Sequence, residues 1–244
     1  MEDVYSRARS DFGPLWAVRR IAGLTGGAVY LVREQDPLLV DAGAAWDVPR
    51  ILATLESSGL RPQDLRYIVL THHHPDHAGG AAALQEATGA ELLVHAADAP
   101  YVVGRLPRPR LRGVLSALAS WWFSRGCRPA QVDNRLFDGD LIGGLQVIHT
   151  PGHTPGSICL YHPQRRGLFV GDLLRSAGRK SNRLAEMPRG FTENLPLSRR
   201  SIQRVAGLPV DVIYPAHGDV VYVDATNVLR AFARRLARTE LGLS

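Results

Sequence analysis

The chain is predicted to fold as an α/β protein, because short apolar segments alternate with segments of helical composition along its length. The clearest example lies between residues 67 and 95. Residues 67–70 and 91–95 are strand candidates, and residues 81–87 between them are an alanine-rich helix candidate that ends at Gly89. A strand, a helix and a second strand in this order are typical of a βαβ unit with parallel strands.

The N-terminal segments precede this unit with more strands and one helix. Strands are expected at residues 16–21, 28–33 and 38–40. A turn at 25–27 joins the first two, which predicts that they pair. Asp47 is the expected N-cap of the first helix, and Gly59 is its expected end.

The second half of the chain repeats the alternation. Strands are expected at residues 145–149, 157–161, 168–170 and 212–214, and helices at residues 198–205 and after Asp224. The last helix has the amphipathic pattern of a surface helix. One face holds Val228, Leu229, Phe232 and Leu236, and the opposite face holds Arg230, Arg234 and Arg238.

Composition indicates a globular protein with an excess of positive charge. The 244 residues contain no Ser/Gly-rich linker, so one domain spanning 1–244 is expected. Residues 1–5 lack the basic and apolar regions of a signal peptide, and no apolar run reaches membrane-spanning length, so a cytoplasmic protein is expected. The two cysteines, Cys127 and Cys159, form no C-x-x-C pattern, which argues against a disulfide framework.

The segment Thr71-His72-His73-His74-Pro75-Asp76-His77 carries the strongest functional signal. It directly follows the strand candidate at 67–70 and contains the pattern H-x-H-x-D-H. Histidine and aspartate are poor core residues, and closely packed imidazoles repel one another when protonated. A metal ion removes both problems, because it binds neutral imidazole nitrogens and ionised carboxylates. The segment therefore predicts a metal site.

Three further motifs follow in order along the chain. His153 lies in the rigid turn 151–156, Asp172 follows the apolar strand candidate at 168–170, and His217 follows the strand candidate at 212–214. A single H-x-H pattern is weak, but four ordered motifs at strand ends are specific. Together they resemble the metallo-β-lactamase superfamily over residues 16–232.

This resemblance implies an αβ/βα sandwich, with two mixed sheets and helices outside, and a centre of two divalent metal ions. The first ion would be held by His72, His74 and His153, the second by Asp76, His77 and His217, and Asp172 would bridge them. Zinc is the expected metal, with manganese or iron as alternatives. A water or hydroxide bridged between the ions would be the nucleophile, and Asp76 and Asp172 are the expected catalytic residues.

The residues around the motifs have expected supporting roles. Pro75 should keep His74 extended, and Gly79-Gly80 should let the next helix pack close to the site. Asp41 follows the strand candidate at 38–40, and it is expected either to accept a hydrogen bond from a ligand imidazole or to serve only in a turn. His73 is expected to point away from the metals.

The substrate class rests on weaker signals, because the superfamily cleaves several kinds of bond. Ala177-Gly178 is similar to glyoxalase II sequence, whereas acyl-homoserine lactonases place a Tyr where this chain has Arg175. We expect hydrolysis of a small ester, thioester or lactone, with a small-molecule substrate that is anionic or acyl-bearing. Arg175 and Arg179 are the candidates for binding an anionic group, and Trp121 and Trp122 for contacting an acyl group.

Several alternatives stay open. Residues 98–130 interrupt the strand–helix alternation and are expected to form a helical lid or insertion, but a packed core helix, a homodimer contact or a membrane-surface contact would also fit. A mononuclear-iron, persulfide dioxygenase-like enzyme would use His72, His153 and Asp172. The net charge of +6 admits a nuclease, although nucleic acid is not the expected partner. A non-enzymatic binding protein would require a degraded site, and none of the seven ligand positions is degraded.

Overall fold

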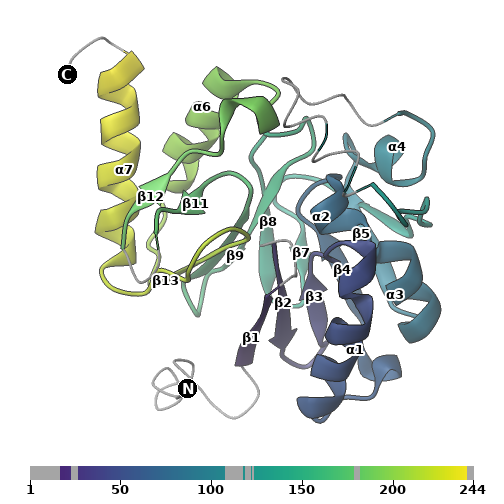
Figure 1. Cartoon of the computed structure of the whole chain (residues 1–244). Helices are drawn as coiled ribbons and strands as arrows, with labels where there is room; N and C mark the ends of the chain where they lie inside the picture. Colours follow the sequence, from purple (N-terminus) through teal and green to yellow (C-terminus); the bar gives the residue numbers. More distant parts are fainter. Residues whose placement is uncertain are drawn as a thin grey trace.

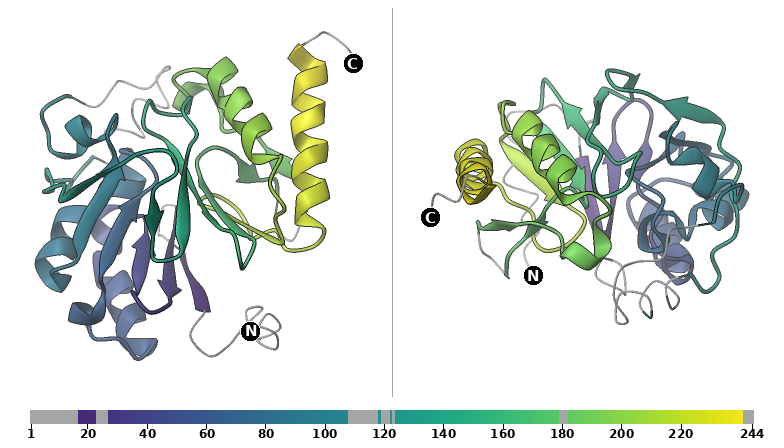
Figure 2. Two further views of the ribbon diagram at one scale, coloured as in Figure 1. Left: turned by 180° about the vertical axis from the view of Figure 1, so that it is seen from behind. Right: turned by 90° about the horizontal axis from the view of Figure 1, so that it is seen from above.

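Two β-sheets face each other and helices cover both outer sides, so the chain forms four layers (Figures 1 and 2). The computed structural model describes residues 17–22, 27–107, 118, 122, 124–178 and 182–240. This arrangement is the αβ/βα sandwich that the motifs implied. Within the described residues, no helix is long and apolar enough to cross a membrane.

The first sheet has six strands in the order β1-β2-β3-β4-β5-β6. Their bounds are β1 Ala17–Ala22, β2 Ala28–Arg33, β3 Leu38–Val40, β4 Tyr67–Leu70, β5 Glu91–His95 and β6 Asn134–Leu136. β1, β2 and β3 pair antiparallel, and β3 to β6 pair parallel, so the sheet is mixed as expected.

The second sheet has five strands in the order β13-β10-β9-β8-β7, and a two-stranded ribbon of β11 and β12 accompanies it. Their bounds are β7 Leu141–Ile142, β8 Leu145–His149, β9 Ile158–His162, β10 Gly167–Gly171, β11 Arg175–Ser176, β12 Leu184–Ala185 and β13 Val212–Pro215. Only β10 and β13 pair parallel among these described strands.

The helices form the outer layers and two short connections. Their bounds are α1 Val48–Ser57, α2 Pro75–Ala78, α3 Ala81–Thr88, α4 Ala99–Val102, α6 Leu195–Val205 and α7 Ala225–Glu240. The longer helices lie in two pairs, with α1 and α3 outside the first sheet and α6 and α7 outside the second (Figure 1). Each sheet therefore buries one face against helices and the other face against its partner sheet.

Alternating side chains on β2 show how this layering follows from the sequence. Val29 and Leu31 pack in the apolar cluster under α1 and α3. Tyr30 points the other way, into the cluster between the two sheets, because successive strand residues face opposite sides. There its ring meets Phe169 edge to face at 5.5 Å, and Phe169 stacks on Tyr214 at 4.6 Å. Aromatic residues thus pack between the two sheets and hold them together.

The structure confirms one expected helix start and corrects another. Asp47 is the N-cap residue of α1 as expected, but its side chain makes no cap bond to that helix and instead accepts the backbone N–H of Ala44 at 3.1 Å. The expected helix at 198–205 begins three residues earlier, at Leu195, with Asn194 as the N-cap. Pro196 concealed this start, although proline is well tolerated in the first turn because those N–H groups have no partner inside the helix.

Much of the expected lid lies outside the described residues. Within 98–130, α4 is helical and Leu118 and Trp122 are also in helical conformation. Both of those apolar side chains are more than half exposed, at 57% and 53%. Cys159 is buried and Cys127 is partly exposed, and the structure places neither of them in a disulfide bond.

Candidate metal centre

Strand ends bring the candidate ligands together at one edge of the two sheets. β3, β4 and β5 are parallel, so Asp41 after β3 and segment 71–77 after β4 leave the sheet at the same edge. In the second sheet, Asp172 follows β10 and His217 follows the parallel strand β13. His153 lies on the loop between β8 and β9. The Ile158 N–H donates to the Thr71 carbonyl at 2.9 Å, which joins the edges of the two sheets.

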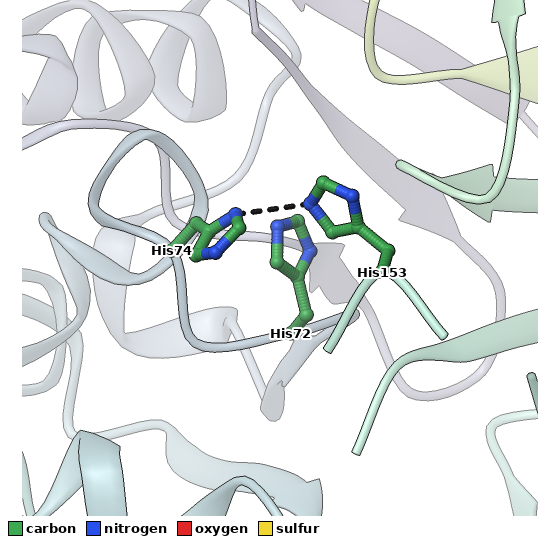
Figure 3. Close-up of side chains that lie close together, drawn as sticks. All are labelled: His72, His74 and His153. Atoms are coloured by element: carbon green, nitrogen blue, oxygen red, sulfur yellow. Dashed lines mark hydrogen bonds between the residues drawn. The ribbon is translucent and has the colours of Figure 1, made fainter. Parts of the chain in front are cut away.

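Three imidazoles form the first group of candidate ligands. His72, His74 and His153 each offer a nitrogen within 4.8 Å of the others, and all three side chains are buried. Figure 3 shows the rings converging, with His153 Nε2 at 2.9 Å from His74 Nδ1. The ring centroid of His72 lies 4.7 Å from each of the other two. Convergent nitrogens on a buried face are typical of a three-histidine metal site.

The second group consists of Asp76, His77 and His217, whose ligand atoms also lie within 4.8 Å of one another. Asp172 lies between the two groups. Its Oδ1 is 3.2 Å from His77 Nε2 and 3.3 Å from His217 Nε2, whereas its Oδ2 is 3.4 Å from His153 Nε2. The structure therefore brings together all seven residues that the sequence singled out, with one carboxylate facing both groups.

Local backbone features give segment 71–77 its shape. His74 is extended, with φ −63° and ψ 150°, and Pro75 begins the short helix α2. α2 places Asp76 and His77 beside the extended residues instead of continuing away from them. A Cβ on Gly79 or Gly80 would collide with the carbonyl oxygen of Pro75 or Ala42, so only glycine lets the chain turn this closely into α3. Both local expectations are thus confirmed.

Asp41 anchors the ligand segment 71–77 through hydrogen bonds. Its carboxylate accepts the Thr71 N–H at 2.7 Å, the Thr71 hydroxyl at 2.9 Å and His77 Nδ1–H at 2.8 Å. Because the Thr71 hydroxyl donates to Asp41, it can accept from His72 Nδ1 at 3.1 Å. Both imidazoles then carry a proton on Nδ1 and turn Nε2, the nitrogen that would bind a metal, toward the site.

Burial and charge shift the pKa values of the two ligand groups in different ways. Burial, reinforced by neighbouring imidazoles, lowers the pKa of His72 and His74 well below the usual value, and burial lowers the pKa of His153 to about 4. These three rings are therefore neutral donors at neutral pH, which is the form that binds a metal.

The second group is dominated by its carboxylates. Burial would raise the pKa of Asp76, but the charge of His77 and the hydrogen bond from His217 bring it to about 2. The Asp172 carboxylate raises the pKa of His217 to about 10, against the effect of burial. This negative charge would stabilise a bound cation as it stabilises the imidazolium.

The donor set fits a metal ion. His72 Nε2 is buried and, within the described part of the chain, has no hydrogen-bond partner. Leaving such a nitrogen unsatisfied costs about 1–3 kcal/mol, and a bound cation would remove that cost. Imidazole and carboxylate donors suit zinc, manganese and iron alike.

The expected substrate residues are placed less clearly than the ligands. Arg175 lies in β11, and its side chain is half-buried. The next residue, Ser176, donates its N–H to the His217 carbonyl at 3.0 Å. Trp122 is exposed, with the Arg125 guanidinium over its ring at 5.0 Å. Arg179 and Trp121 lie outside the described residues.

Two acidic residues near the site carry no recognisable signal in the sequence. Asp98 is fully buried, and its Oδ2 lies 2.9 Å from His73 Nδ1. Glu193 brings a carboxylate oxygen within 4.8 Å of nitrogens of His73 and His74, and burial raises its pKa. The position of Asp98 after β5, the parallel neighbour of β4, could have indicated that it reaches the same edge.

Comparison with known proteins identifies the family. Residues 22–217 match the family model described as the metallo-beta-lactamase superfamily, and the chain belongs to it. Hydroxyacylglutathione hydrolase from Aeromonas hydrophila is 33% identical over 209 residues, which cover 83% of this chain and 65% of the relative. The probable metallo-hydrolase YqjP from Bacillus subtilis is 27% identical over 237 residues, which cover 87% of this chain and 73% of that protein.

Solved structures agree on the fold. A metallo-beta-lactamase family protein from Thermus thermophilus matches with a TM-score of 0.68 and 25% identity, covering 94% of this chain and 82% of the other. Rm3 metallo-beta-lactamase matches with a TM-score of 0.68 and 22% identity, covering 95% and 93%. Family, fold and histidine-rich site together define a metallo-hydrolase of this superfamily.

Proposed function

We propose that the chain hydrolyses a small ester, thioester or lactone with two divalent metal ions, zinc being the expected metal. The observation that carries this proposal is the position of Asp172. One of its oxygens faces His77 and His217, and the other faces His153. A carboxylate with an oxygen toward each ligand group is suited to bridge two ions.

The candidate ligands would bind the metal ions, and one of them, Asp76, would also transfer a proton. His72, His74 and His153 would hold one ion, Asp76, His77 and His217 the other, and Asp172 both. When bound, the ions supply Lewis acidity and lower the pKa of a water held between them from about 15.7 toward about 7. Asp76, whose pKa is about 2, is ionised at neutral pH. Its Oδ2 can orient the attacking water and pass the water's proton to the leaving group.

The choice of substrate class is supported by the relatives. The name hydroxyacylglutathione hydrolase denotes an acylated glutathione, a thioester, as the substrate of that relative. This chain spans 65% of the length of the relative. Several arginines outside the site are paired with carboxylates, among them Arg128 with Glu86 at 2.7 Å and Arg166 with Asp211 at 3.2 Å. These pairs weaken the case for a nucleic-acid substrate, because they neutralise charge that would contact phosphates.

The test is turnover of a panel of esters, acyl thioesters and lactones by zinc- and manganese-loaded protein. Turnover of at least one class is expected, with loss of at least 100-fold in kcat/KM for His153→Ala and Asp172→Asn. His162→Gln is the matched control, because His162 is a buried imidazole bonded to Glu34 at 3.0 Å and belongs to neither ligand group. No turnover of any class, or oxygen uptake with a glutathione persulfide instead, would contradict the proposal.

Arg175 is proposed to bind an anionic group of the substrate, because β11 lies against the backbone of His217. Arg175→Ala should raise KM for an anionic substrate by at least about tenfold and leave KM for a neutral analogue unchanged, since a charge-assisted hydrogen bond contributes about 1.5–3 kcal/mol. Arg166→Ala serves as the control, because Arg166 pairs with Asp211. An unchanged KM for the anionic substrate would exclude this role.

A further inference from the structure

Asp98 connects the two loops that carry the first ligand group. Its Oδ2 accepts the His73 backbone N–H at 2.9 Å, His73 Nδ1–H at 2.9 Å and the Thr154 hydroxyl at 2.8 Å. Its Oδ1 accepts the Gly156 N–H at 2.7 Å. His73 lies between His72 and His74, and Thr154 directly follows His153. One buried carboxylate thus hydrogen-bonds to a residue that is the direct sequence neighbour of each ligand in the first group.

The side chain of Asp98 makes these bonds in place of a local one. Asp98 precedes α4, where an aspartate usually caps the helix, but it makes no side-chain cap bond there. Gly156 closes over it so tightly that a Cβ at Gly156 would lie 2.6 Å from Asp98 Cγ. The backbone of the His153 loop is therefore fitted to this carboxylate.

The position of His73 in the chain explains how such a contact acts on the ligands. His73 is bonded covalently to both His72 and His74, so the bonds that Asp98 makes to its backbone N–H and to its ring restrain the backbone that carries these two histidines. The bonds to Thr154 and Gly156 fix the position of His153 relative to that pair. Without Asp98, segment 71–77 and loop 150–157 would lose the buried carboxylate that hydrogen-bonds to both of them.

We propose that Asp98 is a positioning residue that holds His72, His74 and His153 at the spacing required for the first metal ion. This inference rests on the proposed metal centre. In this role Asp98 does not contact the metal itself but keeps the three histidines arranged to receive it. Loss of a partner behind the ligands typically costs about 10–100-fold in metal affinity.

The experiment is a competition titration of metal-free protein with zinc and a chromophoric chelator, repeated with cobalt so that the visible spectrum reports coordination. Asp98→Asn keeps the size of the side chain and an oxygen for Gly156 but replaces the oxygen that serves His73 and Thr154 by an amide NH2. We expect the affinity for one ion to fall about 10–100-fold and the cobalt bands to shift. Thr154→Val removes the hydroxyl that bonds to Asp98 and to Ser157, and it should give about a threefold to tenfold fall.

Asp133→Asn is the matched control. The Asp133 carboxylate accepts the Leu92 N–H at 2.8 Å and the Gln85 side-chain amide at 3.0 Å, so it stabilises the same sheet without touching a ligand loop. Asp133→Asn should leave both metal affinities and the cobalt spectrum unchanged. If folded Asp98→Asn and Thr154→Val bind both ions with native affinity and spectrum, the inference is overturned while the proposed function stands. If the native protein takes up no metal, both fail.

Discussion

Replacing Asp41 by asparagine should weaken the binding of the proposed second metal ion. Asparagine tolerates the positive φ of 67° at this position, so the turn after β3 should be kept. Its oxygen can still accept both bonds from Thr71. Its amide nitrogen cannot accept His77 Nδ1–H, which now donates to the carboxylate at 2.8 Å. The substitution therefore removes one contact, behind one ligand.

The expected magnitude follows from that contact. A hydrogen bond to a charged group contributes about 1.5–3 kcal/mol. Losing the partner of a metal-bound histidine costs about 10–100-fold in affinity, which corresponds to about 1.4–2.7 kcal/mol. The two estimates agree, so the dissociation constant of one ion should rise by at least tenfold. Zinc competition with a chelator measures this directly.

Asp47→Asn provides the comparison for that measurement. Asp47 is another buried carboxylate that accepts a backbone N–H, from Ala44, and it belongs to neither ligand group. Its substitution should leave both dissociation constants within about twofold of native, which is well below the effect expected behind a ligand. A native zinc affinity in Asp41→Asn, or an equal loss in Asp47→Asn, would refute the assignment of Asp41 to His77.

Three further predictions concern stability and reactivity. Phe169→Ala should lower the free energy of unfolding by about 3–5 kcal/mol in urea titrations, because the fully buried ring packs between the sheets against Tyr30 and Tyr214; a loss below about 1 kcal/mol would contradict that packing. Cys159 should react with a thiol reagent only after unfolding, because burial raises the pKa of its thiol to about 12, whereas the partly exposed Cys127 should react in the native protein; two equally fast thiols would contradict this. Free metal at about 1,000 times its dissociation constant should stabilise the protein by about 4.1 kcal/mol, and its removal by a chelator should lower Tm; an unchanged Tm would count against a metal site in the folded state.

Local sequence signals predicted most of the regular elements. β4, β5 and β8 have the expected bounds, because each is a short apolar run bounded by polar or turn residues. β6, β7, β11 and β12 were missed. Each has only two or three residues, and its partners rather than its own composition make it a strand.

The candidate ligands were visible in the sequence, but the residues that hydrogen-bond to them or to their neighbours were visible only in part. His72 and His74 stand out because imidazoles at this spacing have few structural uses. Asp41 follows a recognisable strand, so its place behind a ligand could be expected. Asp98 has no local pattern that separates it from a helix-capping aspartate. Its function depends on the loop containing Thr154, more than 50 residues away, and such a contact is a property of the fold.

The measurement that tests the central claim most directly is the identity and stoichiometry of metal in protein purified without added metal. The two ligand groups that share Asp172 predict about two zinc or manganese ions per chain. One iron per chain would contradict the dinuclear hydrolase and favour dioxygen chemistry. Protein that holds no metal and takes up none on reconstitution would contradict the metal centre itself.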